Sequence, residues 1–122
     1  MLLNNFFYID DMSHNEYRIV AAVHINVEHE ILKGHFPEQP VVPGVCVLEM
    51  MKEVLQIALA KKLMMTESVM IKFLTVFAPP TFTKAIFEID YKANEENMLN
   101  VTATLKHEST VFLKFKGIFA EK

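Results

Sequence analysis

Residues 34–49 read GHFPEQPVVPGVCVLE, and this stretch decides how the rest of the chain is interpreted. Its three prolines and two glycines predict a stiff, turn-rich loop over the first part. That loop holds one histidine, His35. Apolar residues become dense directly after Gly44, and Glu49 sits among them. A histidine on a rigid loop and a carboxylate in an apolar helix form a candidate acid/base pair.

Composition predicts one globular domain over residues 1–122, with 52% hydrophobic and 22% charged residues. A net charge of −3 without a basic cluster argues against nucleic acid as a partner. The single cysteine, Cys46, cannot form an internal disulfide, which indicates a reducing compartment. No apolar run reaches the length of a membrane span, and the first residues lack the pattern of a secretory leader. We therefore expect a cytoplasmic protein without membrane contact.

Apolar patterning predicts a strand, a helix and then four strands. We expect a strand over 17–27, a loop over 28–43 and a helix from Pro43 to about Leu63. Residues 6–9 are interpreted as a short strand or turn that docks on the core, and residues 10–15 as a turn. The four later strands are expected over 68–77, 82–93, 98–107 and 110–120.

The predicted helix is apolar nearly all round, so we expect it to be buried nearly all round. The rest of this small chain must supply the covering. Sequential strands with short turns favour an antiparallel sheet. A long antiparallel sheet curled around one helix is the economical arrangement, although other α+β arrangements satisfy the same pattern.

The motif HFP-x-x-P-V-x-P-G-V-x-x-x-E, which starts at His35, resembles the signature of the β-hydroxyacyl-acyl-carrier-protein dehydratases. In that family a histidine and a glutamate fourteen residues apart are the catalytic pair, and His35 and Glu49 have the same separation. The resemblance implies the hot-dog fold, in which a curved antiparallel sheet wraps around a central helix. It is specific over residues 34–51 and diffuse elsewhere.

The resemblance also implies a reaction, the dehydration of a carrier-bound 3-hydroxyacyl thioester to the trans-2-enoyl thioester. His35 would be the base at C2, and Glu49 would handle the departing hydroxyl. Backbone N–H groups at the helix start, near Gly44, would hold the thioester oxygen. No metal or cofactor is implied. The residues expected to contact the substrate are Gly44, Val45, Phe36 and Leu48.

The family also suggests partners for the chain. Its histidine and glutamate meet across a dimer interface, which implies a homodimer here, with a dimer of dimers as a further alternative. The second partner is an acyl carrier protein, which is acidic. Candidate docking residues for it are Lys33, Lys72 and Lys84.

Other interpretations of these residues stay open. Glu49 has Lys52 and Glu53 at the following turn, so it could be a rim residue paired with the lysine or repelled by the glutamate. Glu38 replaces a family glycine in the histidine loop and points to a divergent branch. A thioesterase of the hot-dog fold and a non-catalytic acyl-binding partner subunit are the rival functions. Cys46 is interpreted as packing, although a nucleophilic pair with His35 is another option.

The other histidines carry no site in this interpretation. They show no metal-ligand spacing with acidic or cysteine partners. These histidines are His14, His24, His29 and His107. His24, in a predicted strand, is interpreted as structural.

Overall fold

The structure, a computed structural model, describes residues 1–34 and 39–122. The described chain folds into strands and helices in the order β1 (Phe7–Asn15), β2 (Arg18–Ile25), α1 (Glu30–Gly34), α2 (Gly44–Leu59), β3 (Leu63–Phe73), β4 (Lys84–Ala93), β5 (Leu99–His107) and β6 (Thr110–Glu121).

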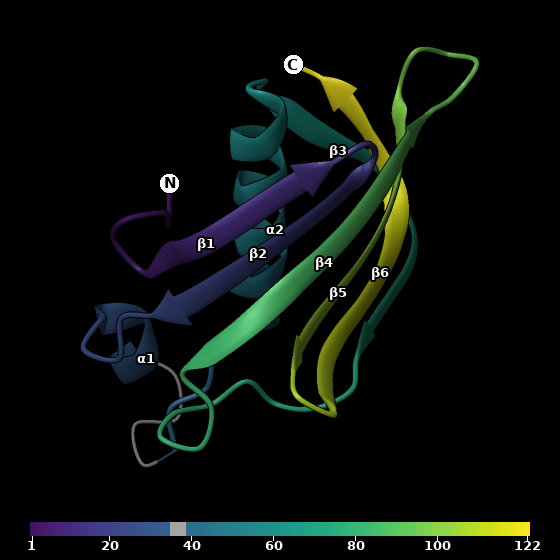
Figure 1. The fold of residues 1–122 in the computed structure, drawn as a ribbon. Helices are drawn as coiled ribbons and strands as arrows, with labels where there is room; N and C mark the ends of the chain where they lie inside the picture. The colour runs from purple at the N-terminus through teal and green to yellow at the C-terminus, as the bar shows by residue number, and fades with distance from the viewer. Residues whose placement is uncertain (35–38) are drawn as a thin grey trace.

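The strands form one antiparallel sheet in the order β1-β2-β4-β5-β6-β3. Figure 1 shows this sheet curving around α2, with α1 beside the end of β2. The predicted α+β architecture, a curved antiparallel sheet around a central helix, is confirmed. β1 and β3 are the two edge strands, so β3 follows α2 in the chain but pairs with β6, the last strand.

Alternation along the strands places one apolar face against α2. Phe87 and Leu105 are opposite each other on β4 and β5, and both are fully buried. Phe6 and Phe7 are also fully buried, so the expected docking of the first residues on the core is confirmed. From the helix, the core receives Val47, Met50, Met51, Val54 and Leu55.

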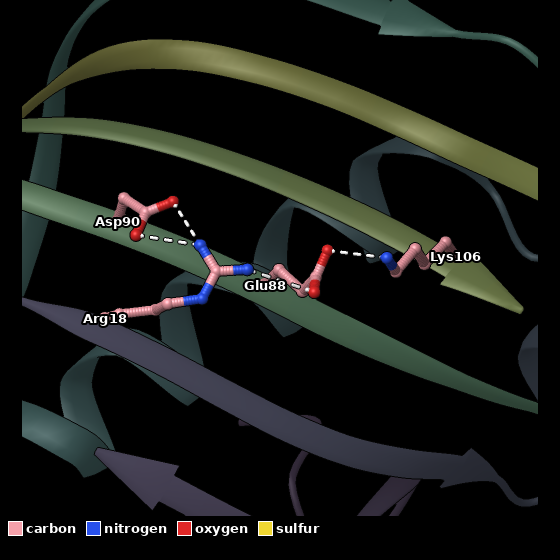
Figure 2. A network of polar contacts seen from close by, with 4 residues as sticks. All are labelled: Arg18, Glu88, Asp90 and Lys106. Carbon is pink, nitrogen blue, oxygen red and sulfur yellow. Dashed lines mark hydrogen bonds and ion pairs between the residues drawn. The ribbon is translucent and has the colours of Figure 1, made fainter. Parts of the chain in front are cut away.

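The opposite face of the sheet carries a network of charged side chains across β2, β4 and β5 (Figure 2). Arg18 bridges Asp90 at 2.9 Å and Glu88 at 3.1 Å, and Lys106 contacts Glu88 at 2.8 Å. Arg18 and Asp90 are about half exposed, and Glu88 and Lys106 are partly exposed, so solvent weakens these ion pairs and the network contributes little to stability. Its position on the outer face separates it from α2.

Several predicted boundaries are wrong. The strand expected over 68–77 is β3, Leu63–Phe73, which begins earlier because its first residues pair with β6, and the loop expected over 28–43 contains α1. Residues 10–15 belong to β1 instead of a turn, because this edge strand is held by backbone pairing with β2 and exposes most of its side chains. The helix ends at Leu59 instead of near Leu63, because Ala60 adopts a left-handed conformation with φ 52°. Gln56 Oε1 then accepts a hydrogen bond from the backbone N–H of Leu63 at 2.8 Å, which ties the helix end to the start of β3.

The expectation that the helix is buried on all sides is also wrong for the single chain. The side chain of Val45 is 75% exposed and that of Ile57 is 45% exposed. The sheet therefore covers one side of α2 and leaves these two apolar side chains exposed. Within the described residues, no helix combines the length and apolar character needed to cross a bilayer.

Candidate active site

The start of α2 is the first part of the site. Pro43 is its N-cap residue and provides no side-chain cap. The first helical hydrogen bonds are donated to the carbonyl oxygen of Pro43 by Cys46, at 2.9 Å, and by Val47, at 3.1 Å. The backbone N–H groups of Gly44 and Val45 therefore lie ahead of the first helical bond, where a helix can bind an anion or a polarised oxygen.

An apolar cleft of about 580 Å³ opens beside this helix start. Gly44 and Val45 form one wall, and Phe112 lines the floor from β6. The end of β3 and the segment after it form the other wall, with Phe73, Leu74, Thr75, Val76 and Phe77. A cleft of this size and character suits an acyl chain.

A second cleft, of about 300 Å³, lies farther along the same helix and contains Glu49. Leu48 and Lys52 line it from α2, together with residues of β3 and β6. Val45 lines both clefts, so the two meet at this residue. The structure thus brings four predicted site residues together along α2, namely Gly44, Val45, Leu48 and Glu49.

Glu49 is one-third exposed, and its Oε1 lies 3.1 Å from Nζ of Lys52. Burial acts to raise the pKa of Glu49, but hydrogen bonds from Glu53 and Lys52 and the charge of Lys52 outweigh it and lower the pKa. Of the two simple interpretations, pairing with Lys52 is confirmed. Repulsion by Glu53 also acts, because the charge of Glu49 contributes to raising the pKa of Glu53.

Glu53 is a residue whose role the sequence analysis missed. Its side chain is fully buried, and Oε1 accepts hydrogen bonds from the backbone N–H groups of Leu2, at 3.0 Å, and Leu3, at 2.7 Å. Burial and the hydrogen bond to Glu49 raise its pKa above the ordinary value, and the two amides oppose this rise. The signal in the sequence was the four-residue spacing from Glu49 within an apolar helix.

Several predicted residues are not part of this cluster. His35, Phe36 and Glu38 lie outside the described residues. The candidate docking lysines lie on three different elements, Lys33 in α1, Lys72 in β3 and Lys84 at the start of β4. β5 and β6 separate the strands of the latter two in the sheet.

The other titratable side chains in the described chain favour structural roles. Burial and then the nearby Glu49 charge raise the pKa of the Cys46 thiol, which disfavours a thiolate nucleophile. Nδ1 of His24 lies 2.7 Å from Asp10, and its ring stacks on Tyr8. Among the residues that the structure describes, no three histidine, cysteine or acidic side chains gather as metal ligands.

Comparison with known families gives this arrangement its context. Residues 11–116 match the family model described as ApeI-like, ApeI dehydratase. The chain belongs to the ApeI-like dehydratase family. The match spans α2 and most of the sheet, so the ApeI-like assignment rests on most of the chain and not on the short motif alone.

Curated relatives of this ApeI-like chain include 3-hydroxyacyl-[acyl-carrier-protein] dehydratases named FabZ. The one from Lactococcus lactis is 38% identical over 55 residues, which are 45% of this chain and 35% of that protein. The one from Thermotoga neapolitana is 29% identical over 115 residues, covering 88% of this chain and 80% of that protein. The chain therefore spans about a third of the Lactococcus relative and most of the Thermotoga relative.

Solved structures show the same fold at low sequence identity. The dehydratase heterocomplex ApeI:P from Xenorhabdus doucetiae matches with a TM-score of 0.64 and 17% identity, covering 90% of this chain and 95% of that one. An uncharacterised protein from Erwinia carotovora subsp. atroseptica matches with a TM-score of 0.64 and 18% identity, covering 92% and 90%. These matches establish the hot-dog architecture.

Proposed function

We propose that this ApeI-like dehydratase removes water from a carrier-bound 3-hydroxyacyl thioester and yields the trans-2-enoyl thioester. The observation that carries the proposal is the position of Glu49, in a cleft that meets the apolar cleft at the start of α2. Membership of a dehydratase family and similarity to FabZ proteins support the same reaction.

The proposed roles follow the sequence motif. His35 takes the proton from C2 of the substrate, and Glu49 supplies the proton for the departing hydroxyl. The backbone N–H groups of Gly44 and Val45 hold the thioester oxygen, because they precede the first helical hydrogen bond. This arrangement stabilises the negative charge that develops on the oxygen as the C2 proton leaves.

The acyl chain occupies the apolar cleft beside α2 in this proposal. Leu48 and Phe36 contact the chain near the reacting carbons, and the aromatic wall of the larger cleft receives its far end. Carrier docking involves Lys33, Lys72 and Lys84, all of which have exposed side chains. The lone Cys46 supports a reducing compartment, and we place the protein in the cytoplasm.

A second copy of the chain covers the free edge of β3 in this proposal. That edge strand and the segment after it expose a row of large apolar side chains, and α2 adds the exposed Val45. A long apolar edge invites pairing with another strand. The residues in the row are Met64, Met65, Val69, Ile71, Phe73, Leu74 and Val76. The homodimer buries them and brings the histidine of one subunit to the glutamate of the other.

A different chain is the alternative occupant of this edge. The solved relative from Xenorhabdus doucetiae is a dehydratase heterocomplex, ApeI:P, which favours this alternative. In that case the protein is one subunit of a two-component dehydratase, and the purified chain alone is inactive.

The deciding experiment is incubation of the purified chain with a 3-hydroxyacyl thioester on carrier protein. Enoyl absorbance and free thiol are followed in parallel. Dehydration gives absorbance without thiol, whereas a thioesterase gives thiol without absorbance. If the isolated chain gives neither enoyl absorbance nor free thiol, the single-component enzyme is contradicted and the partner-subunit alternative is favoured.

Two variants test the assigned roles. His35→Ala and Glu49→Gln are each expected to lower the dehydration rate by about 10²–10⁴-fold, the usual effect of losing a general acid or base. Exposed His14→Ala is the matched control and is expected to keep wild-type activity, because His14 lies on β1, at the opposite edge of the sheet from β3. A near-wild-type rate for either site variant removes that residue from the mechanism.

A further inference from the structure

The outer face of the sheet, which is turned away from α2, carries three neighbouring lysines on β6 and β3. Lys114 and Lys116 are exposed and alternate along β6 with the buried Phe115 and Gly117, so both point to this face. Lys72 of β3 is also exposed and is directly opposite Lys114. These three residues, the lysine group, gather positive charge in one part of a chain whose net charge is −3.

The nearby carboxylates on this face are already paired with other cations. Arg18 and Lys106 hold Glu88, at 3.1 Å and 2.8 Å, and Arg18 holds Asp90 at 2.9 Å (Figure 2). Among the residues that the structure describes, no carboxylate lies within ion-pair distance of the lysine group. The lysine group therefore presents uncompensated positive charge to solvent.

The opposition of Lys72 and Lys114 has a cost for folding. Like charges that are directly opposite on neighbouring strands destabilise a sheet. An anionic partner that lies over both side chains replaces this repulsion with attraction. The arrangement thus suits binding better than it suits the stability of the isolated chain.

Two shallow clefts on the same face join into one groove beside the lysine group. Lys114 lines the first, of about 210 Å³, and Lys92 lines the second, of about 310 Å³. Lys116 and Thr102 line both clefts, so the two are continuous. Asp90 lines both as well, and its charge is compensated by the ion pair of Figure 2. A groove with lysines along its walls fits an amphipathic helix that carries acidic side chains.

We propose that this groove and the lysine group form the docking surface for an acidic helix of the carrier protein that presents the acyl thioester. This inference rests on the proposed dehydratase function. Of the docking candidates Lys33, Lys72 and Lys84, the surface includes Lys72, and it adds Lys114 and Lys116. Pairing of the β3 edge with a second copy extends the sheet within its own plane, so the outer face stays accessible in the proposed homodimer.

The end of β3 connects this surface with the substrate cleft. Lys72 belongs to the lysine group, and the next residue, Phe73, forms part of the wall of the larger cleft. Phe73 is opposite Leu113, which precedes Lys114 in β6. A carrier seated in the groove therefore needs to pass its thioester arm only around the end of β3.

An anionic membrane surface is the competing partner for exposed lysines. Two features favour a protein. The lysine group lies beside a groove, which a helix can enter and a flat bilayer surface cannot. Glu88 and Asp90 also line the groove, and they repel a uniform layer of anionic headgroups, whereas a helix places its acidic side chains at the lysines alone.

The first arm of the test measures binding without any assay of activity. Fluorescently labelled holo acyl carrier protein is titrated with the wild type, Lys114→Glu and Lys116→Glu at low ionic strength. We expect each variant to raise Kd by about tenfold or more and to weaken its dependence on salt, because an attractive charge becomes repulsive. Lys62→Glu is the matched control and should keep the wild-type Kd, since this exposed lysine precedes β3, at the other end of the strand from Lys72.

Lys114→Glu also separates docking from folding. The new carboxylate is opposite Lys72, so attraction replaces repulsion and the melting temperature should stay the same or rise. A variant that melts no earlier than the wild type but binds the carrier poorly has lost the docking surface and kept the fold. If Lys114→Glu does not fold, Lys116→Glu carries the test, since its opposite residues, Met70 and Thr102, are uncharged.

The second arm compares two substrates with the same 3-hydroxyacyl group, one on carrier protein and one on the small neutral thiol N-acetylcysteamine. Lys114→Glu should raise KM for the carrier substrate by about the factor found for Kd and leave kcat unchanged. It should leave kcat/KM for the small thioester unchanged. Equal losses with both substrates show a structural effect and overturn the proposal.

These arms separate the docking surface from the reaction on which it rests. Carrier binding that is absent in the wild type, or equal in the wild type and both variants, overturns the docking surface, whatever the dehydration assay shows. Wild-type protein that binds the carrier through these lysines but forms no enoyl product supports the docking surface and refutes the proposed function.

Vesicles of phosphatidylglycerol serve as the third probe in the binding arm. We expect no difference between the wild type and Lys114→Glu in vesicle binding. Vesicle binding that is lost in Lys114→Glu, together with unchanged carrier binding, assigns the lysine group to a membrane surface and overturns the proposal.

Discussion

The phenyl ring of Phe73 lies against Gly44, with its Cζ 2.8 Å from the position that a Cβ atom would take at the glycine. The ring belongs to the last residue of β3, and the glycine is the first residue of α2. The contact brings the end of the edge strand onto the helix start and forms part of the wall of the larger cleft. Glycine permits this close approach, since any side chain would meet the ring.

Gly44→Ala is expected to displace the ring without unfolding the protein. Phe73 is 52% exposed, so its side chain can move away from the new methyl group. We expect the free energy of unfolding to fall by about 1 kcal/mol, at the lower end of the cost of overpacking. Urea unfolding measures this change. The dehydration rate should fall by more than any loss of folded protein explains, because the ring then moves into the cleft that receives the acyl chain.

Gly117→Ala provides a contrast with a larger expected effect. A Cβ atom there would lie 2.6 Å from the carbonyl oxygen of Glu67 and 2.6 Å from Cζ of Phe115. The first neighbour is backbone of the paired strand β3, which cannot rotate away. We expect a loss of about 1–3 kcal/mol in the same urea experiment. Equal losses for the two alanine variants would contradict this account of the two contacts.

The buried Glu53 predicts how stability changes with pH. Its folded pKa is raised above the ordinary 4.5, so the folded protein keeps a proton that the unfolded chain has lost. The contribution of Glu53 is fully present below pH 4.5 and decreases as the pH rises through the folded pKa. Glu49 has a lowered pKa and acts in the opposite sense, losing its contribution as the pH falls below 4.5.

Glu53→Gln should therefore gain stability relative to the wild type as the pH rises from about 4.5 to about 8. The difference in unfolding free energy, measured at several pH values and one fixed protein concentration, checks this expectation. A difference that is independent of pH would show that Glu53 has the same proton affinity in the folded and unfolded states.

The exposed edge of β3 predicts the effect of a charge on association. Val69 is 60% exposed on this strand, and Val69→Lys should convert the proposed homodimer to monomers by placing a charge in the apolar contact. Sedimentation at micromolar concentration measures the change. Val27→Lys is the matched control, since this valine is 45% exposed in a loop after β2, and it should leave the mass unchanged. A wild-type monomer would contradict the dimer directly.

Strong apolar periodicity made much of the fold predictable from the sequence. The central helix and the later strands carry buried side chains at regular spacing, and Pro43 marks the helix start. The later part of β1 was missed because residues 10–15 are polar and mostly exposed. The helix end was misplaced because Ala60 is a good helix former, and the chain is turned there by its left-handed conformation and by tertiary contacts of Gln56.

The candidate site also has a part that the sequence predicted and a part that it could not predict. The motif pointed to Gly44 and Glu49 by spacing, and both line clefts on α2. The partners of Glu53 could not be predicted, because Leu2 and Leu3 are about fifty residues away and are brought to α2 by the folded chain. His35 lies outside the described residues, so its role remains a prediction.

The two irregularities in the pairing of β3 with β6, between Met65 and Glu67 and between Ser68 and Met70, bear on how far association can extend. Bulges bend a strand and interrupt the regular row of edge hydrogen bonds. A flat regular strand therefore finds a poor match along this edge, whereas in the proposed homodimer the two-fold-related strand carries the same bends. Such a homodimer would close on itself after two chains and would keep the apolar edge from growing into a fibril.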